Sequence, residues 1–126
     1  MAIENKILKE LLEGEFKGLL PRPKIKWASR GEYISYTDDT LGLRTYDGVD
    51  IAWVIEDVNR KEFYPVIYLN DGFEGMKIAL RRNKEYLRDT LRHECLHLLL
   101  KRGDGDPVFE AEKKKRGLDE DPYLKI

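Results

Sequence analysis

Both histidines of this chain fall within five residues, His93-Glu94-Cys95-Leu96-His97, which form the pattern H-E-x-x-H. Residues four positions apart lie on one face of an α-helix, so both imidazoles can bind the same metal ion. Glu94 follows the first ligand directly, where a carboxylate can take a proton from an activated water. The pattern predicts a Zn²⁺ site with Glu94 as the general base. The alternative is two ordinary helix histidines beside a salt-bridging glutamate.

The helix that carries this pattern is expected over residues 83–102. At about 100° per residue, His93 and His97 lie near 240° and 280° from Leu87, away from the main leucine stripe. Cys95 lies at about 80°, on the far side of the helix from both imidazoles. We therefore expect Cys95 to be a small buried residue and not a metal ligand.

A catalytic zinc ion usually has three protein ligands and one open position. The chain has no third histidine, so a carboxylate after the helix is expected to complete the site. Asp104 is preferred because Gly103 and Gly105 flank it in a turn, whereas Asp106 precedes Pro107 and suits the N-cap of a last helix. The candidates for the third ligand are Asp104, Asp106, Glu110 and Glu112.

The remaining chain predicts an α+β fold in a single domain over residues 1–126, which is long enough to bury one core. An N-terminal amphipathic helix is expected over 3–16, and the last helix should run from Pro107 to about Arg116. Between them we expect an antiparallel sheet of about three to five strands. Pro65 should lie at the start of its strand or at an edge. The expected strands are 25–27, 33–36, 41–46, 49–58 and 63–70, with a hairpin connection at 57–61 and a docked or frayed tail over 118–126.

Residues 90–97, followed by 104–110, resemble the SprT-like zinc metallopeptidases, and the order of expected elements is similar over nearly the whole chain. The resemblance implies a zincin-like minimal metallopeptidase domain that cleaves proteins or peptides. It also implies substrates bound or crosslinked to DNA; a regulatory protein is the alternative substrate. The family commonly has a third histidine where this chain has Asp104, five residues before Phe109.

The net charge and the single cysteine limit which other functions this chain could have. The net charge of −1 gives no overall attraction to nucleic acid or to an anionic membrane, so the basic clusters are interpreted as solvated helix surfaces. One cysteine cannot form an intrachain disulfide or a zinc ribbon. Without a signal-like or membrane-spanning apolar segment, a cytoplasmic protein is expected. The alternatives to a peptidase are a non-catalytic module with a structural zinc and a DNA-associated accessory protein.

Overall fold

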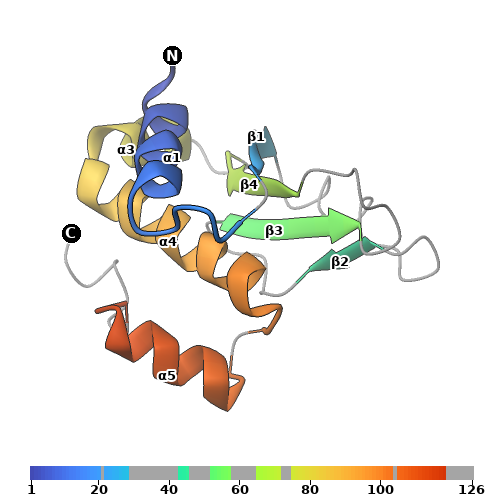
Figure 1. Ribbon diagram of the computed structural model, residues 1–126. Coiled ribbons are helices and arrows are strands. Elements are labelled where there is room, and N and C mark those ends of the chain that lie inside the picture. Colours follow the sequence, from blue (N-terminus) through green and yellow to red (C-terminus); the bar gives the residue numbers. More distant parts are fainter. Residues whose placement is uncertain are drawn as a thin grey trace.

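The computed structural model describes residues 1–20, 22–28, 43–45, 52–57, 65–71, 75–103 and 105–118, with the backbone alone for 43–45 and 52–57. This part of the chain has an α+β architecture in which helices lie on one side of a small sheet (Figure 1). Its elements are α1 (Ile3–Glu13), β1 (Lys24–Ala28), β2 (Leu43–Thr45), β3 (Ala52–Asp57), β4 (Val66–Asn70), α3 (Met76–Arg82), α4 (Lys84–Leu100) and α5 (Pro107–Lys115).

The four described strands form one sheet in the order β1-β4-β3-β2. β4 lies between two partners, and all five of its residues are buried. Pro65 precedes this strand, and its carbonyl oxygen accepts a hydrogen bond from the amide of Lys24 at 2.9 Å. Of the two expected positions for Pro65, the start of its strand is nearly right, since β4 begins one residue later at Val66, and the edge is wrong, since β4 is an inner strand.

The expectation of an entirely antiparallel sheet is wrong. β2 with β3 and β3 with β4 pair antiparallel, but β1 pairs parallel with β4 in the register Lys24↔Val66 to Ala28↔Asn70. Parallel neighbours need a long crossover connection, and the whole segment between β1 and β4 supplies it. The expected strand 33–36, residues 58–61 of the expected hairpin and the tail beyond Leu118 lie outside the described residues.

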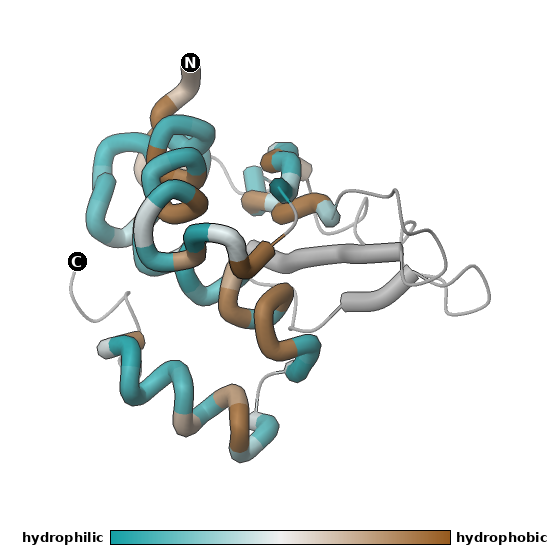
Figure 2. Tube along the Cα trace, viewed as in Figure 1, coloured by the Kyte–Doolittle hydropathy of each residue, from teal (hydrophilic) through white to brown (hydrophobic). Residues whose placement is uncertain are grey.

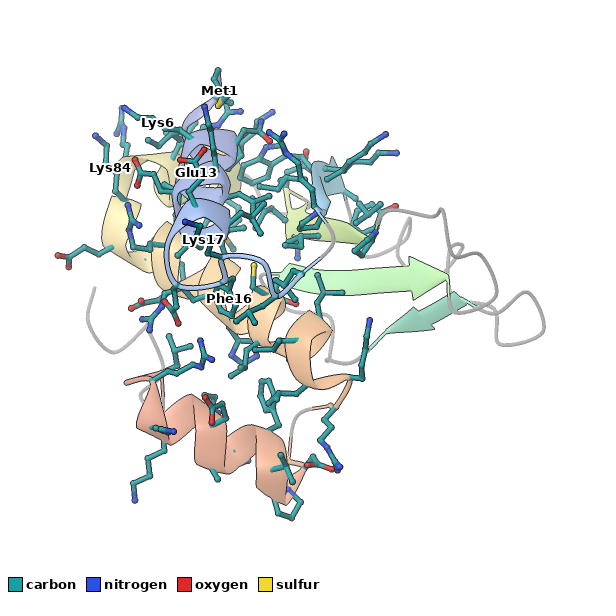
Figure 3. The ribbon with its side chains drawn as sticks, in the orientation of Figure 1. Met1, Lys6, Glu13, Phe16, Lys17 and Lys84 are labelled. Atoms are coloured by element: carbon teal, nitrogen blue, oxygen red, sulfur yellow. The ribbon has the colours of Figure 1, made fainter. Side chains whose placement is uncertain are left out.

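α1 packs one apolar face on the body of the protein, as its periodicity predicts. The helix ends at Glu13, three residues earlier than expected, and Gly14 follows as the C-cap. The chain then turns, and the amide of Phe16 donates to the carbonyl of Leu11 at 2.9 Å. Figure 3 shows Phe16 directed from this turn toward α4, whereas Glu13 lies on the exposed face of α1. Phe16 thus closes the core below the helix.

α4 is the centre of the core, and α1, α3, β3 and α5 all contact it. Asn83 caps its first turn by accepting a hydrogen bond from the amide of Tyr86 at 3.1 Å. Apolar residues concentrate in the second half of α4, while most of α5 is hydrophilic (Figure 2). The buried residues that pack together here include Ile7, Leu8, Leu11, Phe16, Ile67, Leu69, Leu80, Leu87, Leu91, Cys95 and Leu98.

The sequence patterns did not indicate α3, the short helix before α4. Seven residues with three basic side chains carry little apolar periodicity, and only Leu80 is buried. Its place in the fold is set by Arg81, which reaches Glu4 of α1. Among the described residues, no helix is both long enough and apolar enough to cross a membrane.

Candidate metal centre

His93 and His97 meet on one face of α4, as their spacing predicts. Their Nε2 atoms lie 3.0 Å apart, and the ring centroids are 4.7 Å apart with an interplanar angle of 74°. Two nitrogens bound tetrahedrally to one zinc ion at about 2.0–2.1 Å would be separated by about 3.3 Å. The observed separation is about 0.3 Å shorter than this and lies within the range of an N–H···N hydrogen bond. His97 is fully buried, and His93 is half-buried.

The second nitrogen of His97 fixes the chemical state of its ring. Nδ1 lies 2.8 Å from the carbonyl oxygen of Arg102. A carbonyl can only accept, so in this contact Nδ1 carries the proton and the Nε2 of a neutral ring keeps its lone pair. That lone pair faces His93, whose Nε2–H donates to it at 3.0 Å.

Lys101 provides the turn that brings this carbonyl to the ring. It ends α4 with φ 57° and ψ 38°, and its amide still donates to the carbonyl of His97 at 2.9 Å. Left-handed backbone is uncommon for a residue with a side chain. Here the left-handed residue turns the chain back directly after α4. The carbonyl of Arg102 can therefore contact Nδ1 of His97 and orient that ring.

Phe109 of α5 covers the two imidazoles. Its ring stacks on His97 with a centroid distance of 4.1 Å and an interplanar angle of 5°. It also meets His93 edge-on at 5.3 Å and 79°. Phe109 has no exposed surface. The two imidazoles thus lie between α4, which carries them, and the aromatic ring of Phe109.

Glu94 and Cys95 lie on different sides of α4. The Glu94 side chain is buried, with 2% of its surface exposed. Cys95 packs in the core with Leu91 and Leu98, and burial raises the pKa of its thiol to about 12. A thiol in this environment stays protonated near neutral pH. The expectation that Cys95 has a packing role is confirmed.

Asp106 is the N-cap of α5, also as expected. Its Oδ1 accepts hydrogen bonds from the amides of Val108 at 2.9 Å and Phe109 at 3.3 Å, while Oδ2 pairs with Arg102 at 3.0 Å. Desolvation would raise the pKa of Asp106, but the Arg102 guanidinium and the two amides outweigh it and hold that pKa below its ordinary value. Both oxygens are therefore committed to positioning α5.

The two candidate glutamates of α5 are also engaged. Glu110 accepts from the amide of Gly105 through Oε1 and pairs with Lys113 through Oε2, each at 3.0 Å. Glu112 accepts from Nε of Arg116 at 2.8 Å. Among the described residues, no group of three or more His, Cys, Asp or Glu side chains could hold a metal. Asp104, the preferred third ligand, lies outside the described residues.

The far end of α5 is tied to the rest of the protein by Glu15, Arg92 and Arg116, which we call the Glu15 network. Arg92 Nε and Arg116 Nη1 contact the Glu15 carboxylate at 2.7 and 3.0 Å, and Arg92 Nη2 also donates to the carbonyl of Arg116 at 2.8 Å. Desolvation would raise the pKa of Glu15, but these two guanidinium groups outweigh it and lower the pKa. Leu118, directly beyond, is buried.

Sequence patterns identified the two imidazoles but missed three contributors to their geometry. Lys101, the carbonyl of Arg102 and the ring of Phe109 each act through backbone conformation or tertiary contact. Only Phe109 gave a signal, as the lone aromatic residue in the first turn of the last helix. No protein-family model matches the chain, and neither a curated protein nor a solved structure is significantly similar to it.

Proposed function

We propose that the protein is a zinc-dependent hydrolase of peptide bonds, with a zincin-like domain of the SprT-like type. The observation that carries the proposal is the His93–His97 pair. Two imidazole nitrogens converge to 3.0 Å, and the Arg102 carbonyl fixes the tautomer that leaves the His97 lone pair directed at the same point.

The donor set suits zinc, because neutral imidazole is one of the ligands that this ion prefers. His93 and His97 would hold it, and Asp104 is proposed as the third ligand. Asp106, Glu110 and Glu112 are less suited, since each carboxylate already has other partners. Zinc, when bound, polarises a carbonyl and makes water more acidic.

Glu94 is proposed as the general base. Its carboxylate lies on the turn of α4 that carries His93 and is screened from solvent. In this role a carboxylate oxygen takes a proton from the attacking water and returns it to the leaving amine nitrogen. The half-buried His93 marks the side from which a substrate carbonyl would approach, because His97 is covered by Phe109.

The same cover favours a second candidate, a non-catalytic module in which zinc is structural. His97 and Phe109 are both fully buried, and structural zinc sites are closed to substrate. The two candidates differ in what they require of Glu94. Catalysis depends on its ionisable carboxylate, whereas a structural site needs only its volume.

Replacing Glu94 by glutamine tests this difference. Metal content by mass spectrometry and cleavage of an unfolded protein, with and without DNA, are compared for the parent chain, Glu94→Gln and the control Glu85→Gln, which alters an exposed residue in the first turn of the same helix. We expect one zinc per chain in all three, and a loss of cleavage of roughly a hundredfold or more in Glu94→Gln alone. Zinc binding without cleavage by the parent chain favours the structural module. Equal cleavage by Glu94→Gln excludes Glu94 as the base.

The physiological substrates are proposed to be proteins, either bound to DNA or regulatory. A cytoplasmic location belongs to the same proposal, because a reduced lone cysteine suits that compartment. Stimulation of cleavage by DNA, declining steeply with salt, would support the DNA-bound class.

A further inference from the structure

We infer that Phe109 is a positioning residue for the metal centre: its ring sets the plane of the His97 imidazole and thereby aims Nε2 at the point that His93 also faces. The inference rests on the metal pair of the proposed function and assigns to α5 a part in forming it. It concerns metal affinity first, and hydrolysis only through that affinity.

The geometry distinguishes this role from ordinary packing. An apolar side chain can fill space at any angle, but Phe109 lies within 5° of parallel to His97 at a centroid distance of 4.1 Å. The same ring presents an edge to His93 at 5.3 Å and 79°. One flat group thus contacts both imidazoles and restricts the torsion about which each ring turns.

The ring nitrogens of His97 have contacts of another kind. Its Nδ1 contacts the Arg102 carbonyl and its Nε2 faces His93, and hydrogen bonds at ring nitrogens lie close to the ring plane. Neither contact bears on the ring face. Phe109 supplies a flat surface there, and a rotation of His97 out of its plane would collide with that surface.

Two features of the sequence bring Phe109 to this place. Asp106 caps α5 and accepts from the amide of Phe109 itself, which fixes the residue in the first turn. At the other end, the Glu15 network and the buried Leu118 fasten α5 to the body. Most of α5 is hydrophilic (Figure 2), and Phe109 is the one buried residue in this fully described helix.

The test measures the affinity of the metal-free protein for Co²⁺, whose visible spectrum reports ligand geometry, and for Zn²⁺ by competition. Phe109→Leu and Phe109→Met retain an apolar side chain without a ring, and Phe109→Tyr retains the ring. Val108→Ala is the matched control, because Val108 is exposed and directly precedes Phe109 in α5. Circular dichroism and thermal unfolding of each metal-free variant establish that it folds.

We expect Phe109→Leu and Phe109→Met to lower metal affinity by roughly 10–100-fold and to change the Co²⁺ spectrum. Phe109→Tyr should restore both, and Val108→Ala should leave both near the parent values. A folded Phe109→Leu or Phe109→Met chain with parental affinity and spectrum overturns the inference. An equal loss in Val108→Ala overturns it too, because the effect would then not depend on the ring of Phe109.

The inference and the proposed function fail in different ways. A parent chain that binds Co²⁺ but cleaves nothing contradicts the hydrolase, while the affinities of the variants still decide the role of Phe109. A parent chain that binds neither metal overturns both. Parental affinity in Phe109→Leu, together with active parent enzyme, removes only the role of Phe109.

Discussion

The carboxylate of Glu4, buried in the first turn of α1, accepts hydrogen bonds from both Nε and Nη2 of Arg81 in α3, at 3.1 and 2.7 Å. Trp27 of β1 donates to the same carboxylate through Nε1 at 3.1 Å. Three elements far apart in the sequence therefore meet at one charge. Desolvation would raise the pKa of Glu4, but the hydrogen bonds from Arg81 and Trp27 outweigh it and lower that pKa.

This cluster predicts a loss of stability in acid. Because the pKa of Glu4 is lower in the folded chain than in the unfolded chain, its contribution is present above the ordinary glutamate pKa of about 4.3 and is lost as the pH falls through the folded value. At pH 7, Glu4→Gln should cost about 1.5 kcal/mol of unfolding free energy, the low end for a charged hydrogen bond because Arg81 is partly exposed. Urea unfolding between pH 7 and pH 3 measures this. The exposed Glu13→Gln change on the same helix is the control, and a Glu4→Gln chain as acid-sensitive as the parent would contradict the prediction.

Removing either imidazole should abolish most metal binding. His93→Ala and His97→Ala each leave one nitrogen where two converge, and the remaining ligands form a poor site. Zinc content after dialysis provides the measurement. Arg88→Ala, an exposed change on the same helix, should keep the full content. Full occupancy in His97→Ala would place any zinc elsewhere.

Asp104 and Asp106 should have opposite effects when replaced by alanine. Asp106→Ala removes the cap of α5 and should lower the melting temperature by a few degrees while zinc remains largely bound. Asp104→Ala should weaken zinc binding strongly and leave the helix intact. Zinc affinity and thermal unfolding of both variants decide the matter. If only Asp106→Ala loses zinc, the two roles are exchanged; if neither does, a glutamate of α5 or water completes the site.

The left-handed backbone at Lys101 predicts unequal effects of two substitutions. Lys101→Gly should be tolerated, because glycine adopts φ 57° without strain. Lys101→Val should cost about 1–2 kcal/mol in unfolding free energy, since a β-branched residue resists this conformation. It should also weaken zinc binding by moving the Arg102 carbonyl away from His97. Affinity and unfolding measurements on the pair test both effects, and a valine variant with parental zinc affinity would disconnect the turn from the site.

Glu15→Gln should loosen α5 without unfolding the protein. The change removes the charge that Arg92 and Arg116 share, and these partly exposed pairs contribute less than about 1 kcal/mol each. Amide hydrogen exchange should accelerate in α5 and remain slow in α4. Glu10→Gln, which breaks an exposed pair with Arg88, should leave α5 unchanged. Uniform acceleration in both helices would indicate a global effect instead.

The sequence predicted α4, the N-cap of α5 and the position of Cys95 because each depends on local spacing. His93 and His97 share a face for geometrical reasons alone, and Asp106 before Pro107 suits one position in a helix. Apolar periodicity likewise placed α1, although Gly14 ended it before Phe16.

What the sequence could not predict depends on contacts between distant residues. The residues of β1, Lys24–Ala28, have the pattern of any short strand. Their parallel pairing with β4 depends on the path of the chain between the two strands and is not encoded in β1 itself. α3 is fixed by the pair between Arg81 and Glu4. The position of Phe109 over the imidazoles required the docking of α5, which no pattern within α5 encodes.

The parallel pairing of β1 also bears on how the chain folds. In the antiparallel pair of β2 and β3, Thr45 pairs with Ile55, 10 positions later. In the parallel pair of β1 and β4, Lys24 pairs with Val66, 42 positions later. Closing the longer loop loses more chain entropy before any contact repays it, and such non-local pairing slows folding. β1 is therefore expected to join a sheet already begun by β2, β3 and β4. The rate of reaching the native state would then depend on that closure, long after α4 has formed its turns.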